Sequence, residues 1–257
     1  MEKKYKILVT NDDGIDSPGI YALASAMSQL GEVVVAAPDR QQSAVGHALT
    51  VARPLRITKV KRNGTVFGYA IDGTPSDCVK IALSNLLEGK PDLVISGINH
   101  GQNTAINILY SGTVAAATEG MLADVPSIAI SVASHDISVP MDAAAEYASK
   151  IASKLLESKL KPNFLLNVNV PAIPKENILG IKVAKHSSSY WKDTYEMRLD
   201  PFGRKYYWFA GEYCLESEDD IETDDAALAK GYVTITPVHF DFTKYDVLSE
   251  LKHFEVE

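Results

Sequence analysis

The strongest constraint on the fold is a short apolar run near the N-terminus that stops at two adjacent carboxylates. Residues 7–10 read Ile-Leu-Val-Thr and are followed by Asn11, Asp12, Asp13 and Gly14. A run of this length, with a helix-start signal soon after it, predicts the first buried strand of a parallel α/β sheet. Ligand sites in such sheets lie at the carboxyl ends of the strands. We therefore expect a site here.

The two carboxylates can converge on one ligand only if the chain bends after the strand, because successive strand side chains point to opposite faces. Gly14 has no Cβ and permits such a bend. Asp12 and Asp13 would repel each other, and either a shared proton or a hard cation with oxygen ligands relieves this repulsion. Of these two, we favour a divalent cation, either Mg²⁺ or Mn²⁺. In the alternative, one carboxylate caps the next helix, but Ser17 and Pro18 already supply an N-cap and a first-turn proline.

Length, charge and cysteine content narrow the class of protein. The 257 residues can bury one substantial core, and a net charge of −8 argues against a nucleic-acid polymer as partner. Cys78 and Cys214 lie far apart, so neither a disulfide framework nor a thiolate metal site is indicated. No stretch approaches the ~20 apolar residues of a membrane span, and residues 11–13 interrupt any signal-peptide h-region. We expect a cytoplasmic protein without membrane contact.

Strand and helix patterns alternate along the first two thirds of the chain. Further strands are expected at 33–37, 92–98, 126–132 and 163–170, and helices at 17–30, 73–87, 114–122 and 141–156. An Asn63-Gly64 pair between 51–57 and 66–71 predicts a hairpin. The predicted fold class is α/β: a Rossmann-like three-layer core with a mostly parallel sheet over residues 1–171.

Two later stretches bring polar groups to the same edge of the sheet as the two carboxylates. Residues 39–47 follow the second strand and offer the Ser43 hydroxyl, two amides, an Arg and a His. Residues 96–103 leave the third strand, where backbone N–H groups can form an anion-binding concavity while Asn99 or Asn103 points an oxygen at a cation. An ordinary Asn/Gly turn is the alternative for the second stretch.

A third stretch, Ser111-Gly112-Thr113, opens the helix expected at 114–122. Such an entry exposes unpaired N–H groups and two hydroxyls, with the positive end of the helix dipole behind them. These features predict a phosphate site. A plain N-cap would account for the same residues.

Beyond Pro171 the pattern changes, and we expect a C-terminal β-rich extension over residues 172–257. It shows alternation at 181–183, aromatic residues at 206–209, a late strand at 232–238 and a terminal helix at 246–254. The aromatic residues predict either a projecting hairpin that packs on another subunit or a local satellite core. The acidic run from Glu216 to Asp225 is expected to be a solvated loop.

Several ordered motifs together resemble SurE, the stationary-phase survival protein family. They are residues 11–19 (NDDGIDSPG), 37–43 (APDRQQS), 72–77 (DGTPSD), 96–103 (SGINHGQN) and 110–114 (YSGTV), with residues 223–224 (TD), 231–233 (GYV) and 236–237 (TP) near the end. Walker A and G-x-G-x-x-G patterns do not occur in the chain, and no nucleophile elbow is visible.

The resemblance implies a metal-dependent 5′-nucleotidase that releases phosphate from nucleoside 5′- and 3′-monophosphates, with short polyphosphate as a further substrate. It implies a homodimer or homotetramer formed through the C-terminal extension. By resemblance, Asp12, Asp13, Ser43 and Asn99 ligate one divalent cation per subunit, and Asp12, Asp13 and Asn99 are catalytic. Asn103, Ser111, Gly112 and Thr113 bind the phosphate.

The working hypothesis for the mechanism is attack of a cation-activated water on phosphorus, in line with the leaving ribose oxygen. Asp12 is the candidate that orients or deprotonates this water. A covalent aspartyl-phosphate is the mechanistic alternative. The competing function is a non-catalytic, metal-dependent nucleotide-binding or sensing module, because the sequence shows no obvious general acid for the leaving group.

Overall fold

The centre of the molecule is a nine-stranded sheet, seen in a computed structural model that describes residues 5–216 and 219–255. Across the sheet the strands are β3 (Ile57–Arg62), β4 (Thr65–Ile71), β2 (Gly31–Pro38), β1 (Tyr5–Thr10), β5 (Leu93–His100), β6 (Ser127–Val132), β7 (Leu165–Val170), β11 (Val233–Val238) and β8 (Ile181–Val183). Neighbouring strands are parallel except in the pairs β3·β4 and β7·β11.

The order of the strands reverses at β1. The chain passes from β1 to β2 on one side and later places β5 on the other side, so the topological switch point lies between β1 and β5. Ile7, Leu8 and Val9 are fully buried, as expected for a strand covered on both faces. The carboxyl ends of β1 and β5 therefore flank the place where open α/β sheets bind ligands.

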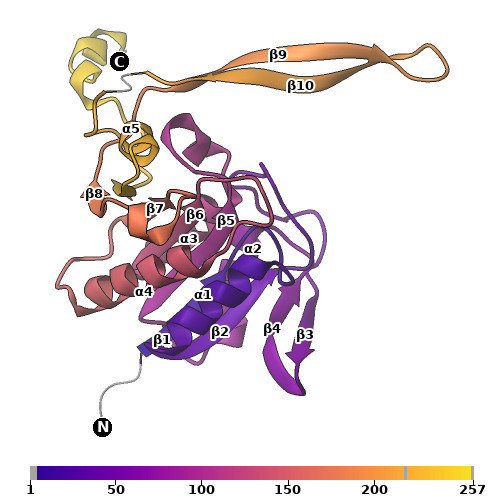
Figure 1. Cartoon of the computed structure of the whole chain (residues 1–257), viewed down its shortest axis with the longest axis vertical. Coiled ribbons are helices and arrows are strands. Elements are labelled where there is room, and N and C mark those ends of the chain that lie inside the picture. The colour runs from indigo at the N-terminus through magenta and orange to yellow at the C-terminus, as the bar shows by residue number, and fades with distance from the viewer. Residues whose placement is uncertain (1–4, 217–218, 256–257) are drawn as a thin grey trace.

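Helices cover both faces of the sheet and give three layers (Figure 1). On one face lie α1 (Pro18–Ser28) and α4 (Asp142–Glu157), and on the other lie α2 (Pro75–Ile81) and α3 (Gly112–Leu122). The N-caps Ser17 and Thr74 begin α1 and α2, each followed by proline, as predicted for Ser17. A π-helix, η1 (Ala82–Leu86), extends α2. The predicted α/β fold class is confirmed.

The remaining elements are short. They are η2 (Ala105–Leu109), η3 (Lys175–Asn177), α5 (Asp224–Ala229), η4 (Tyr245–Val247) and η5 (Glu250–Phe254). Two strands that follow residue 171, β8 and β11, belong to the central sheet. The division of the chain at that residue stays a prediction.

A long hairpin of β9 (Tyr190–Leu199) and β10 (Lys205–Cys214) extends away from the layers (Figure 1). Most of its residues are exposed, including Tyr195, Trp208 and Phe209. Its root, where Trp191 pairs with Tyr213, lies next to the core. The projecting-hairpin prediction describes this segment, whereas a local satellite core does not.

Three sequence-based expectations are wrong in detail. The acidic run is not a solvated loop throughout, because Asp224 and Asp225 are buried and accept several hydrogen bonds, while residues 217 and 218 lie outside the described residues. In place of a terminal helix there are two 3₁₀ turns, η4 and η5, consistent with the marginal stability of short helices that bury no face. The first strand of the hairpin around residue 63 is residues 57–62 rather than 51–57.

The longest helix, α4, has 16 residues, and none of the helices in the described part of the chain is long and apolar enough to cross a membrane.

Candidate active site

The turn after β1 is held by the side chain of Asn11. Its Nδ2 donates to the Gly14 carbonyl (3.0 Å) and to Oγ of Ser17 (2.7 Å), and its Oδ1 accepts the Gly14 N–H (3.1 Å). Gly14 adopts a φ of +95°, which favours glycine and provides the predicted bend. Asn11 therefore ties the turn that carries the two carboxylates to Ser17, the N-cap of α1.

Asp12 is buried and is the most perturbed acid of the site. Its Oδ1 accepts a hydrogen bond from the Thr113 hydroxyl at 2.6 Å. Burial raises the pKa of Asp12 to about 7, with a smaller upward contribution from the neighbouring Asp13, although the hydrogen bond from Thr113 acts to lower it. Among the described residues, no lysine or arginine forms an ion pair with Asp12. Its ionised form therefore lacks a lysine or arginine partner within the part of the chain that the structure describes.

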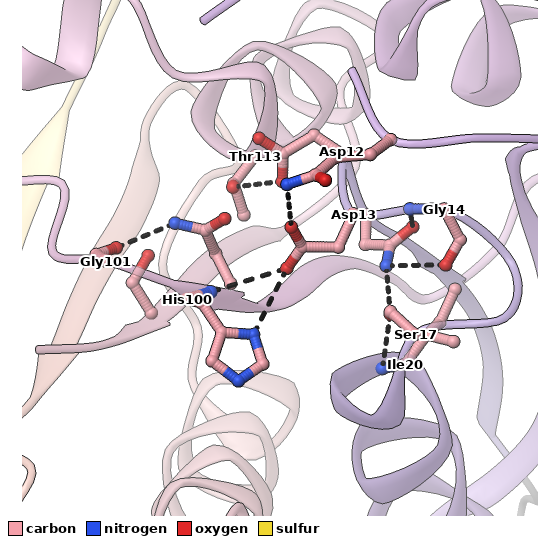
Figure 2. Close-up of polar contacts among 12 residues, drawn as sticks. Asp12, Asp13, Gly14, Ser17, Ile20, His100, Gly101 and Thr113 are labelled. Atoms are coloured by element: carbon pink, nitrogen blue, oxygen red, sulfur yellow. Dashed lines mark hydrogen bonds and ion pairs between the residues drawn. The ribbon is translucent and has the colours of Figure 1, made fainter. Parts of the chain in front are cut away.

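Asp13 contacts the loop after β2 and the last residue of β5, His100, which Figure 2 shows beside it. Its Oδ1 lies 3.4 Å from Nε2 of Gln41, and its Oδ2 accepts the His100 N–H at 3.4 Å and lies 3.7 Å from His100 Nδ1. Gln41 also donates to Oγ of Ser43 at 2.8 Å. The loop after β2 and the end of β5 thus meet at Asp13.

The amide of Asn99 is oriented by the backbone. Its Nδ2 donates to the carbonyl of Gly101 at 2.7 Å, which leaves Oδ1 as the atom available to a ligand. The pairing of β5 with β6 shifts register between Ser96 and Asn99, where the chain also contains a cis peptide bond, Gly97–Ile98. Asn99 therefore presents an oxygen at the carboxyl end of β5.

The first turn of α3 lies directly against Asp12. Ser111 is the N-cap, and its Oγ accepts the Val114 N–H at 3.1 Å. A Cβ added to Gly112 would lie 2.8 Å from Cβ of Asp12 and 3.1 Å from its Oδ2, so only glycine allows this approach. The Thr113 hydroxyl donates to Asp12, whereas Oγ of Ser111 accepts from Val114 and keeps its O–H for donation. The groups that can donate to an anion here are therefore the Ser111 hydroxyl and the backbone N–H groups at the start of α3.

Asn103 is buried against strands β6 and β7. Its backbone carbonyl accepts hydrogen bonds from Asn167 (2.6 Å) and Asn169 (3.3 Å), and its Nδ2 donates to Oγ of Ser131 at 2.8 Å. One of its amide hydrogens is therefore already engaged in the protein.

A cleft of about 590 Å³ joins these groups. Two aromatic residues from the root of the hairpin, Trp191 and Tyr213, line it as well. Their rings meet edge to face at 5.3 Å, and Trp191 Nε1 donates to Oδ1 of Asn107 at 2.7 Å. Sequence reasoning missed both residues as site residues. The aromatic composition of the hairpin was visible, but which end of it meets the core depends on the strand register.

The donor set fits a hard divalent cation. Two carboxylates, one amide oxygen and one hydroxyl, from Asp12, Asp13, Asn99 and Ser43, line the same cleft, and Mg²⁺ and Mn²⁺ prefer such oxygen ligands. The described residues contain no group of three or more His, Cys, Asp or Glu side chains placed to hold a metal ion. This arrangement disfavours a zinc site of the His or Cys type.

A family model described as survival protein SurE matches residues 7–193. The chain belongs to the SurE family. A protein from Flavobacterium johnsoniae called 5′-nucleotidase SurE is 42% identical to it over 256 residues, covering 99% of this chain and 98% of that protein. The protein of the same name from Chlorobium chlorochromatii is 43% identical over 251 residues, covering 98% and 92%. The crystal structure of a SurE protein from Aquifex aeolicus superposes with a TM-score of 0.84 at 41% identity, covering 98% of this chain and all of that one.

In this SurE chain most of the residues singled out from the sequence come together. Six line the cleft: Asp12, Asp13, Ser43, Asn99, Asn103 and Ser111. Gly112 and Thr113 lie directly behind Asp12 and contact it. The prediction of family membership is confirmed. The roles of the individual residues stay predictions.

Proposed function

We propose that this chain is a 5′-nucleotidase that hydrolyses nucleoside 5′-monophosphates to nucleoside and phosphate. The observation that carries the proposal is the convergence of four oxygen donors and the start of α3 on one cleft at the switch point of the sheet. The SurE relatives that match along nearly the whole chain bear the name 5′-nucleotidase, which supports the same reaction. Nucleoside 3′-monophosphates and short polyphosphate are the further substrates to assay.

One Mg²⁺ or Mn²⁺ per chain would be held by Asp12, Asp13, Ser43 and Asn99. When bound, such an ion polarises the phosphoryl group and lowers the pKa of a bound water. The protein prepares the ligands in advance, because Asn11 fixes the turn that carries both carboxylates and Gly101 fixes the amide of Asn99. This preorganisation favours a single coordination geometry.

The phosphate of the substrate would lie at the start of α3. The N–H groups of its first turn point out of the helix, and the helix dipole adds positive potential there. The glycine at position 112 lets this turn approach Asp12 closely, so the phosphate and the cation ligands lie near one another. The same N–H groups can stabilise charge on the equatorial oxygens during transfer.

Asp12 is the proposed group that orients or deprotonates the attacking water. Thr113 holds Oδ1, while Oδ2 faces the first residue of α3. In the cation-free protein burial gives this carboxyl a pKa of about 7, and a bound cation would lower the pKa and keep Asp12 ionised, as a proton acceptor must be. Trapping of a phosphoryl group on Asp12 or Asp13 would instead establish the covalent route.

The nucleoside would lie toward the hairpin root, where Trp191 and Tyr213 offer aromatic faces. Burial raises the pKa of the Tyr213 hydroxyl to about 12, so the group stays protonated and donates to Oδ2 of Asp225 at 3.1 Å. This bond and the one from Trp191 to Asn107 orient the two rings. Aromatic rings that are fixed in this way suit stacking with a base.

The exposed aromatic residues of the hairpin support a homodimer or homotetramer. Trp208 and Phe209 are each more than half exposed near the middle of β10, which is unusual for a monomer. A second copy of the chain is the proposed partner. The two free cysteines, one of them buried, fit the reducing cytoplasm, where we place the protein.

The decisive experiment measures phosphate release from AMP by the purified chain near neutral pH, with Mn²⁺ or Mg²⁺ added and with a chelator in the control. We expect release that depends on the metal and is lost in Asp13→Asn and in Asn99→Ala while the far-ultraviolet circular dichroism stays the same. Asp16→Asn is the matched control, because this nearby carboxylate is largely exposed and pairs with Arg62 outside the cleft. AMP binding without any phosphate release would instead favour the non-catalytic binding module.

A further inference from the structure

A buried carboxylate outside the cleft joins the loop that carries Ser43 to helix α3. Glu119, on α3, is only 6% exposed. Its Oε1 lies 2.8 Å from Nε2 of His47, and its Oε2 accepts from Nζ of Lys80 at 3.2 Å. Burial acts to raise the pKa of Glu119, but the hydrogen bonds from His47 and Lys80 outweigh it, so the net shift is downward. The carboxylate is therefore ionised and satisfied on both oxygens.

The two partners of Glu119 come from different elements. Lys80 belongs to the last turn of α2, which carries no residue of the cleft. His47 belongs to the irregular segment between β2 and β3, four residues after Ser43. Of these two contacts, the one with His47 therefore connects the Ser43 loop with α3.

This segment is otherwise held mainly through its backbone. The N–H of Gln42 donates to the Asp12 carbonyl (2.8 Å), and the N–H of Gly46 donates to the Tyr110 carbonyl (3.1 Å). Further along, the N–H of Thr50 donates to both oxygens of Asp77, at 3.0 and 3.2 Å. Between these anchors Ala44 adopts a φ of +55°, a left-handed conformation that costs an alanine about 1 kcal/mol or more. Such a conformation persists only where the surroundings determine it.

The contact between His47 and Glu119 matters because each residue belongs to a segment that carries part of the proposed site. Its helix begins at the proposed phosphate site, Ser111–Thr113, and the His47 loop presents a proposed cation ligand, Ser43. A shift of the loop along α3 would change the separation of the cation from the phosphate. Errors of about 1 Å in such separations are costly for catalysis.

We propose that His47 is a positioning residue, which through Glu119 holds the Ser43 loop against α3 and thereby sets the affinity of the site for its divalent cation. The inference rests on the proposed function, since it takes Ser43 as a cation ligand. Residues that orient metal ligands from outside the coordination shell change metal affinity by about 10- to 100-fold when they are replaced. The effect on affinity separates this role from a purely structural one, which would change only the thermal stability.

The test is a calorimetric titration of the full-length chain with Mn²⁺ alone, without nucleotide. His47→Asn is polar but too short to reach Glu119, and we expect its Mn²⁺ dissociation constant to rise about tenfold or more. His47→Gln can still donate to Glu119 and should retain most of the affinity. Lys80→Met is the matched control: it removes the other partner of the same carboxylate, and because Lys80 is half exposed we expect a change of less than about twofold.

Weaker binding in His47→Asn alone supports the proposal. Equal dissociation constants in His47→Asn and the wild type, or an equal loss in Lys80→Met, overturn it while leaving the proposed function in place. Absence of Mn²⁺ binding in the wild type would overturn the cation site of the proposed function and this inference with it. Melting curves of all four proteins, recorded without metal, show whether each is folded during the titration.

Discussion

The Thr113 hydroxyl donates a 2.6 Å hydrogen bond to Oδ1 of Asp12, and this bond joins the first turn of α3 to the turn after β1 (Figure 2). The two segments are 101 residues apart in the chain. One carries the proposed cation ligands and the other the proposed phosphate site. The geometry of the reaction therefore depends on how closely α3 approaches β1.

Replacement of Gly112 by alanine should test whether α3 must lie so close to the turn after β1. Alanine is normally better than glycine in a helix by up to about 1 kcal/mol. Here its Cβ would lie 2.8 Å from Cβ of Asp12, so the start of α3 or the turn must move. We expect Gly112→Ala to lower kcat for AMP by about 100-fold, as a displacement of roughly 1 Å does, while the protein stays folded. Wild-type kinetics in this variant would show that the close approach is not needed.

The raised pKa of Asp12 predicts a pH dependence of stability in the cation-free protein. The pKa of Asp12 is about 7 in the folded state against an ordinary value of 3.8 for aspartate, so the folded state holds the proton more tightly than the unfolded state. The free energy of unfolding should therefore fall as the pH rises from about 4 to 7, by about 4 kcal/mol in total. Urea unfolding with chelator at several pH values measures this change.

Asp12→Asn is the control for that experiment, because an amide has no charge to bury. The decline between pH 4 and 7 should be much smaller in this variant, and an undiminished decline would assign the effect to other groups. Added Mn²⁺ should raise the melting temperature of the wild type more at pH 8 than at pH 5, since cation and proton compete for the same carboxylate.

The buried acidic residues in the first turn of α5 should contribute to stability. Oδ2 of Asp225 accepts from the Ser187 hydroxyl (2.6 Å) and from the Tyr213 hydroxyl (3.1 Å). Asp225→Asn replaces one acceptor oxygen by an amide nitrogen and should cost about 1–3 kcal/mol in urea unfolding. Asp219→Asn, in the same acidic run but fully exposed, should change the stability by less than about 0.5 kcal/mol. Equal effects of the two would contradict the burial of Asp225.

The hairpin should hold the subunits together. Trp208→Ser combined with Phe209→Ser removes two exposed aromatic side chains that lie on opposite faces of β10. We expect the mass from sedimentation equilibrium to fall from that of a homo-oligomer toward that of one chain of 27.9 kDa, with an unchanged circular dichroism spectrum. An unchanged mass would place the subunit contact elsewhere.

The strands that carry the site could be predicted because each is buried on both faces. Such burial leaves a continuous apolar run, as in residues 7–9, and the polar residues that follow each run mark the edge of the sheet where ligands bind. The helix starts were equally visible, since Ser17, Thr74 and Ser111 each provide an N-cap.

The residues that the C-terminal part buries or contributes to the cleft could not be predicted from the sequence in the same way. Asp224 is fully buried because it accepts hydrogen bonds from His186 and from the N–H of Ala105, a residue 119 positions away. A charged run gives no sign of such distant partners. Trp191 and Tyr213 reach the cleft only because the register of β9 and β10 pairs them at the hairpin root.

The order of strands also predicts which parts of the molecule unfold locally and which only globally. β1 and β5 are interior strands of the nine, whereas the β9–β10 hairpin pairs with no strand of that sheet. Amide protons of β1 and β5 should therefore exchange with solvent only on global unfolding, and those of the hairpin on local opening. In the proposed oligomer, subunits could then separate or exchange partners many times within the lifetime of a single folded site.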